Sequence, residues 1–163
     1  MAYLNAEKEV MRRVIETLNE MSFDLPDGFF LTSDKYSLDN GQGFINTENY
    51  LSESAGVISL FEVHRDPDEF FVYYDSLVKD LTKVTGKSEL KEQLKLRIGD
   101  FVFPTYVIRG FSGKVIYTVQ VFVNCGDCLG CFMISLDDYK NFKTTMKESP
   151  LLSALVKLLR SVE

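Results

Sequence analysis

Residues 100–136 read DFVFPTYVIRGFSGKVIYTVQVFVNCGDCLGCFMISL, and this stretch decides the fold class of the chain. It begins with two long strand-like segments that are rich in β-branched and aromatic residues. Ser112-Gly113 lies between them and is the kind of two-residue connection that joins hairpin strands, with a glycine able to take a positive φ angle. The sequence therefore predicts a β-hairpin, and residues 131–136 predict a further strand.

Both faces of the predicted hairpin are apolar. With Phe111 opposite Lys114, the side chains fall into cross-strand pairs on either side of the sheet. These pairs are Tyr106 with Val119 and Ile108 with Tyr117 on one face, and Val107 with Thr118 and Phe103 with Phe122 on the other. Such a sheet needs a cover on both faces, by helices or by a partner molecule. Pro104 within a strand indicates an edge or a bulge.

Three shorter strands are predicted before this region, at residues 29–36, 44–50 and 57–63. The separators SLDNGQG and SESAG are rich in turn residues, which favours antiparallel strands with tight connections. Residues 88–96, SELKEQLKL, are expected to form a charged approach to the hairpin.

Three helices are expected around these strands. Residues 5–21 carry apolar side chains at spacings of three and four, as a one-faced amphipathic helix requires. A second helix is predicted from Pro67 to Val84, because Asp66 is suited to cap free amides and proline is suited to the first helical position. Thr85-Gly86 is expected to end it.

The third helix is predicted from Ser149-Pro150 to Val162, with a leucine-rich apolar face. The expected order is α-β-β-β-α-β-β-β-α. The sequence thus predicts an α+β fold in which helices flank an antiparallel sheet of about six strands.

The length and charge limit the function classes. A chain of 163 residues predicts one domain, with a helix at 1–21 and a sheet-plus-helix core at 22–163. The formal net charge of −6 disfavours nucleic acid and anionic membrane partners. No stretch approaches the ~18 apolar residues of a membrane helix, and charges interrupt the amino terminus where a secretory signal would be apolar. We therefore expect an acidic cytoplasmic protein without a membrane span.

The element order and four segments resemble the PsbP/DcrB-like superfamily. The segments are FDLPDGF (23–29), GVISLFEV (56–63), the strand ladder at 101–136 and SPLLSALVKLLRSV (149–162). The superfamily includes photosystem II assembly proteins, bacterial envelope lipoproteins and a nuclear Ran-binding protein. The resemblance covers about residues 22–162. It implies an α/β/α sandwich and a binding or assembly role, with no shared catalytic set to carry over.

The three cysteines, Cys125, Cys128 and Cys131, fall within seven positions and are the candidate site of the sequence. If Cys125 lies opposite Cys131 across a hairpin, the three thiols lie close together. Three interpretations follow: a hairpin turn that uses Cys and Gly, redox or regulatory thiols, and ligands for zinc or an iron–sulfur cluster. The metal interpretation lacks a fourth cysteine and would need Asp127 or His64.

His64 and the paired acidic residues are weaker candidates. His64 is the only histidine, and Asp66 and Asp68 beside it are better explained as helix-capping groups than as orienting carboxylates. Asp137-Asp138 is interpreted as the polar end of a strand. The sequence contains none of the nucleotide-loop, nucleophile-elbow or metalloprotease motifs, so no catalytic residue is assigned.

The sequence therefore favours a non-enzymatic binding or adaptor module that contacts another protein through its aromatic sheet surface or its outer helix. No cofactor is expected, and homodimerisation stays open. A secretion-type chaperone is one alternative, because small acidic proteins of that class also begin and end with helices. A thiol or metal protein built on the three cysteines is the other.

Overall fold

The computed structural model describes residues 21–32, 36–39, 44–81, 86–126 and 128–163. The helix expected at residues 5–21 therefore lies almost wholly outside the described residues. The described elements are, in chain order, β1 (Phe30–Leu31), β2 (Tyr36–Asp39), β3 (Phe44–Ser52), β4 (Gly56–Val63), α2 (Pro67–Lys79), β5 (Ser88–Ile98), β6 (Phe101–Phe111), β7 (Val115–Asn124), β8 (Leu129–Leu136), α4 (Phe142–Glu148) and α5 (Pro150–Arg160). None of these helices has the length and apolar character needed to cross a membrane.

The strands form one antiparallel sheet in the order β1-β3-β4-β8-β7-β6-β5, and β2 also pairs with β3. The predicted α+β class with an antiparallel sheet is thus confirmed. The expected count of about six strands is too low. The strand expected at 29–36 is wrong, because β1 ends at Leu31 and β2 begins at Tyr36.

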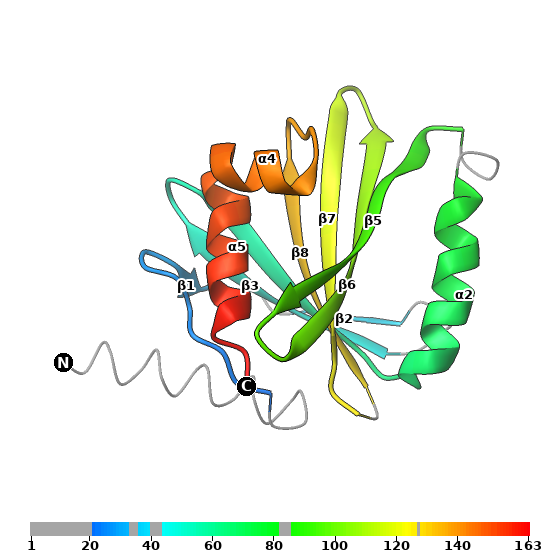
Figure 1. Cartoon of the computed structure of the whole chain (residues 1–163), viewed down its shortest axis with the longest axis horizontal. Coiled ribbons are helices and arrows are strands. Elements are labelled where there is room, and N and C mark those ends of the chain that lie inside the picture. The colour runs from blue at the N-terminus through cyan, green and yellow to red at the C-terminus, as the bar shows by residue number, and fades with distance from the viewer. Residues whose placement is uncertain (1–20, 33–35, 40–43, 82–85, 127) are drawn as a thin grey trace.

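Helices cover both faces of the sheet, as the two apolar faces of the hairpin require. Figure 1 shows α4 and α5 on one side of the sheet and α2 on the other. The side chains of β7 alternate accordingly, so that Val121 packs in the cluster with α5 and Phe122 packs in the cluster with α2. The larger cluster also includes Leu152 and Leu155 of α5 together with Phe132 of β8, and all three side chains are fully buried.

Residues 88–98 form the edge strand β5, which the sequence analysis interpreted only as a charged approach. A bulge at Lys91 explains how this strand packs. Leu90 pairs with Ile108 and belongs to the α2 side, whereas Glu92 pairs with Val107 on the α5 side. Because the extra residue lies between them, two side chains two positions apart face opposite sides of the sheet.

The register of the central hairpin differs from the expected one by a single residue. Phe111 pairs with Val115, so the connection is three residues long and Gly113 has a φ of 78°. The observed pairs are Val107 with Val119 and Ile108 with Thr118 rather than the predicted partners. The third loop residue is the physical reason for this one-residue shift.

Pro104 pairs with β5 only. It lies one residue before the first pair between β6 and β7, which is Thr105 with Val121. The predicted edge or bulge position is wrong, because β6 lies between β7 and β5 in the sheet and the bulge lies at Lys91; Pro104 lies instead where the β6–β7 ladder has ended.

Capping residues begin α2 and α5 where the sequence predicts. Asp66 Oδ1 accepts a hydrogen bond from Glu69 N at 3.1 Å, and Ser149 Oγ accepts one from Leu152 N at 3.2 Å. Helix α2 ends at Lys79 with Asp80 as its C-cap, earlier than predicted, and residues 82–85, which include the predicted end at Val84, lie outside the described residues. Helix α4 was not predicted.

The two ends of the described chain lie together. Ser22 and Glu163 exchange two backbone hydrogen bonds, of 3.2 and 2.8 Å, and Asp24 N donates to Ser161 Oγ at 2.7 Å. These bonds fix the segment that carries Phe23 into the core, where its ring makes edge contacts with other buried aromatic rings.

Candidate functional site

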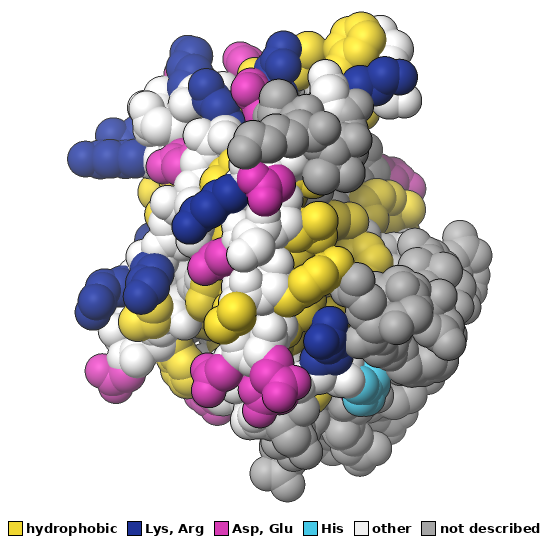
Figure 2. Space-filling view, turned by 90° about the vertical axis from the view of Figure 1, so that its right-hand side faces the viewer, with side chains coloured by type: hydrophobic (Ala, Val, Ile, Leu, Met, Phe, Trp, Pro, Cys, Tyr) yellow, Lys and Arg dark blue, Asp and Glu magenta, His cyan; other side chains and the backbone are white. Residues whose placement is uncertain are grey.

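An apolar cleft of about 250 Å³ lies between α2 and the sheet, and we call it the α2 cleft. Helix α2 contributes Phe70, Tyr73, Tyr74 and Leu77, and Arg65 lies just before it. The sheet contributes Phe61, Val63, Gln120, Phe122, Cys131 and Met133. Figure 2 views the molecule from the side of α2 and shows hydrophobic side chains gathered in the middle of this face.

Aromatic rings build the floor of the cleft. Phe70 and Tyr74 are four residues apart on α2, so they share one helix face, and their rings stack with centroids 5.2 Å apart. The Phe122 ring of β7 lies under them, with its centroid 5.4 Å from that of Phe70 and 5.6 Å from that of Tyr74. Such tilted and edge contacts are favourable for aromatic rings and give this floor a defined shape.

Two tyrosine hydroxyls anchor the helix to the sheet. Tyr74 Oη donates to Gln120 Oε1 of β7, and Tyr106 Oη of β6 donates to Asp75 Oδ1 of α2. Burial, together with the Asp75 hydrogen bond in the case of Tyr106, raises the pKa of both phenols well above the ordinary value. Both groups therefore remain protonated donors at neutral pH.

Arg65 brings a positive charge to the cleft. Its guanidinium carbon lies 5.8 Å from the centroid of the Tyr73 ring, within cation–π range. The Tyr73 side chain is 38% exposed, and its neighbour Val72 is 74% exposed. The Tyr73 ring, which lines the cleft, thus forms an exposed apolar rim.

Cys131 is one wall residue with a nucleophilic atom, but its environment keeps it unreactive. The residue is 5% exposed, and burial raises the pKa of its thiol far above the ordinary value. The thiol therefore stays protonated at neutral pH. Among the described lining residues there is no His, Asp or Glu that could act as its base. The arrangement is suited to binding an apolar group.

The sequence-predicted cysteines are not arranged as the predicted hairpin would have them. Cys131 pairs with Phe122, so the expected pairing of Cys125 with Cys131 is wrong. The β7–β8 connection comprises residues 125–128, closed by a hydrogen bond from Cys125 N to Cys128 O at 3.0 Å. The loop is thus one residue shorter than the five residues, 126–130, that the predicted pairing leaves, and the partner of Cys131 shifts by three residues, from Cys125 to Phe122.

The shift separates two of the three cysteines. Cys125 packs against the α5-side cluster and Cys131 belongs to the α2-side cluster. Cys128 is buried, and none of the three cysteines forms a disulfide. The residues that the structure describes contain no group of three His, Cys, Asp or Glu side chains placed to hold a metal. Because Asp127 lies outside those residues, metal ligation by Cys125, Cys128 and Cys131 stays a prediction.

His64 pairs with a buried carboxylate that the sequence analysis did not consider. Its Nε2 lies 3.0 Å from Glu62 Oε1, and the side chains are 46% and 4% exposed, respectively. Asp66 is the N-cap of α2, as predicted, and Asp68 lies in the first turn. Asp137 follows the last residue of β8 and forms an exposed ion pair with Lys114 at 3.3 Å.

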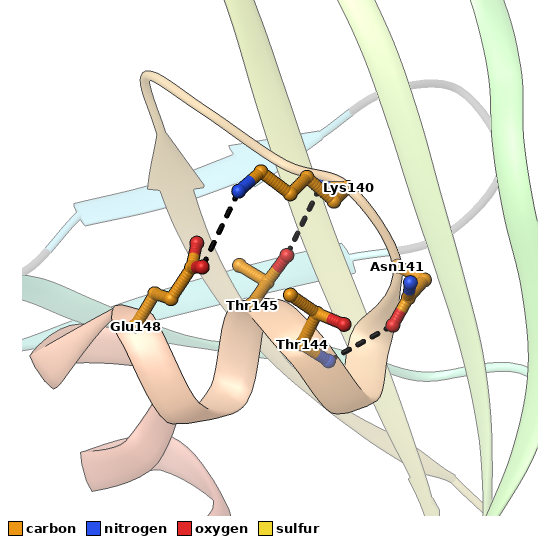
Figure 3. Close-up of polar contacts among 5 residues, drawn as sticks. All are labelled: Lys140, Asn141, Thr144, Thr145 and Glu148. Carbon is orange, nitrogen blue, oxygen red and sulfur yellow. Dashed lines mark hydrogen bonds and ion pairs between the residues drawn. The ribbon is translucent and has the colours of Figure 1, made fainter.

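A second hollow, of about 230 Å³, lies beside α4 and is polar. Figure 3 shows the contacts that shape it. Asn141 Oδ1 accepts from Thr144 N at 2.9 Å, Lys140 N donates to Thr145 Oγ1 at 3.0 Å, and Lys140 Nζ pairs with Glu148 Oε1 at 3.3 Å. These bonds cap and tether the helix, which makes them structural contacts.

The second helix was predicted from the sequence, but the cleft was not. Its lining comes from α2, β4, β7 and β8, which are far apart in sequence. Arg65 and Gln120 could not be identified as cleft residues from the sequence, because a single arginine before a helix and a single glutamine in a strand are ordinary surface residues.

No family model matches the chain, and no curated protein is similar to it at a significant level. The resemblance to the PsbP/DcrB-like superfamily accordingly stays a prediction.

Proposed function

We propose that this protein is a non-enzymatic binding module that holds an apolar side chain of a partner protein in the α2 cleft. One observation carries the proposal: the cleft is open, and its walls are aromatic and aliphatic except for Arg65, Gln120 and the Tyr73 and Tyr74 hydroxyls. Interfaces between proteins concentrate their binding energy where one large side chain fills such a desolvated pocket.

The surroundings of the cleft support a protein partner over a free small molecule. The Tyr73 ring at the rim of the cleft is 38% exposed, and a ligand confined to the cleft would leave part of this ring in water. A partner protein covers both the pocket and this rim, and the covered rim excludes water from the anchor.

The proposal is tested by selecting peptides from a displayed library on the wild-type protein. The affinity of the enriched peptides is then measured for a variant whose cleft is filled, Met133→Phe. We expect the enriched peptides to share an apolar anchor and to lose roughly tenfold or more in affinity for this variant.

Phe111→Ser is the matched control, because Phe111 is 52% exposed at the end of β6 and does not line the cleft. Urea unfolding verifies that both variants remain folded. Equal affinity for wild type and Met133→Phe, or the same loss in Phe111→Ser, would contradict the proposal.

A further inference from the structure

Two side chains bring N–H donors to the otherwise apolar α2 cleft. Tyr74 Oη donates to Gln120 Oε1, so the acceptor end of this amide is already engaged. The Nε2 group, with two N–H donors, is the end that Gln120 has left for a ligand. The guanidinium of Arg65 adds up to five more donors and a permanent positive charge.

Arg65 has no carboxylate within ion-pair distance among the described residues, and its guanidinium lies over the Tyr73 ring. Asp66 is adjacent, but its carboxylate accepts the Glu69 N–H as the helix cap. Asp68 and Glu69 are exposed in the first turn of α2, where water and salt screen them. The guanidinium is therefore placed to bind an anion that arrives with the ligand.

The size of the cleft limits the ligand further. Its volume of about 250 Å³ is just below the ~300–1,000 Å³ of ordinary small-molecule sites. The occupant is therefore about one amino-acid residue in size. It must carry an apolar group and a hydrogen-bond acceptor close together, and its acceptor gains most if it is negatively charged.

In a polypeptide, only the last residue combines an apolar side chain with a carboxylate of its own. We infer that the α2 cleft binds the apolar C-terminal residue of a partner chain, with its side chain against Phe122 and its carboxylate at Arg65. This inference rests on the proposed function and names the chemistry of the partner for the same site.

The test uses N-acetyl-leucine and N-acetyl-leucinamide, which differ only in the terminal charge. The protein is labelled with ¹³C at the methionine methyl groups, and Met133, a cleft residue, reports occupancy. Its signal is identified with Met133→Leu. We expect both probes to shift this signal, with the acid bound roughly fivefold more tightly, as for a partly exposed ion pair.

Arg65→Met keeps the aliphatic stem and removes the charge, so it should abolish the preference for the acid, and Arg65→Lys should restore part of it. Equal affinity of wild type for acid and amide overturns the inference but leaves the proposed function intact. A Met133 signal that neither probe shifts overturns both.

A further pair of probes separates a chain end from a free acid. We expect a tetrapeptide that ends in leucine with a free carboxylate to bind more tightly than 4-methylpentanoate, because its preceding residues can contact the exposed Tyr73 ring at the rim of the cleft. Equal or tighter binding of 4-methylpentanoate overturns the assignment to a protein C-terminus.

Discussion

At the scale of single residues, Cys131 is a cleft residue that burial keeps unreactive. Its thiol lines the cleft, yet burial raises its pKa, and the thiolate is the form that alkylating reagents attack. We expect iodoacetamide at neutral pH to modify the half-exposed Cys125 well before Cys131 in the folded protein. Intact-mass spectrometry over time, followed by peptide mapping, gives the order.

The same labelling in urea is the control, because unfolding exposes all three thiols and should remove the difference. A Cys125→Ser variant should lose only the fast phase. Modification of Cys131 as fast as Cys125 in the folded protein would contradict the burial of the Cys131 thiol.

Glu92 joins β5 to α4 at the scale of elements. Its Oε1 accepts hydrogen bonds from Tyr139 Oη and from Phe142 N, the latter at 3.1 Å. Helix α4 has seven residues, too few to be stable alone, so it depends on such tertiary contacts. We expect Glu92→Ala to lower the free energy of unfolding by about 2 kcal/mol, because it leaves two donors unpaired.

Lys140→Ala is the matched control for this prediction. It removes an ion pair with Glu148 in which both side chains are more than half exposed, and such pairs contribute about 0–1 kcal/mol. Urea denaturation of the two variants measures the contrast. Similar losses for both would mean that Glu92 does not hold the helix.

The bulge in β5 gives an unusual prediction for a deletion. Leu90 and Glu92 already face opposite sides of the sheet, as consecutive residues of a regular strand do. Deleting Lys91 therefore preserves every pair with β6, and we expect a loss of no more than about 1 kcal/mol.

Deleting Gln93 instead forces part of β5 to turn its leucines to the other face, because a one-residue slip exchanges the two faces of a strand. We expect this control deletion to cost roughly 4 kcal/mol or more. Thermal unfolding followed by circular dichroism distinguishes the two. Equal destabilisation would contradict the bulge.

Helix starts were predictable from sequence because caps act locally. Asp66 and Ser149 each accept a hydrogen bond from an amide three residues ahead, so the signal and its effect lie in one short segment. Strand β5 was missed because its charges hid the alternation of Leu94, Leu96 and Ile98, which face the α5-side cluster. Helix α4 offered no comparable apolar period over its seven residues.

At the scale of the whole molecule, the sequence predicted that both faces of the sheet are covered by helices or a partner. It did not predict where helices leave part of a face uncovered. The α2 cleft could not be predicted because its walls combine α2 with side chains of β4, β7 and β8, which come from distant parts of the chain. The predicted registers of the two hairpins were wrong for a related reason, because loop length depends on how the strands pack as well as on turn residues.

Buried ionisable groups make the stability of the whole molecule depend on alkaline pH. Burial raises the pKa values of Cys131 and Tyr74, so the folded state keeps protons that the unfolded state loses. The unfolded state then binds fewer protons, and the free energy of unfolding falls as pH rises. For Cys131 the fall begins near its ordinary pKa of about 8.5, at up to about 1.4 kcal/mol per pH unit, and near pH 10 the tyrosines steepen it.

Urea denaturation between pH 7 and pH 10.5 measures this dependence. Cys131→Ala should be less stable at pH 7, because it leaves a small cavity, but its stability should fall less between pH 8 and pH 10 than that of wild type. Tyr74→Phe should retain the wild-type slope below pH 10 and flatten it above. Parallel curves for wild type and Cys131→Ala would show that this thiol titrates alike in the folded and unfolded chains, and so that the wall of the α2 cleft is hydrated.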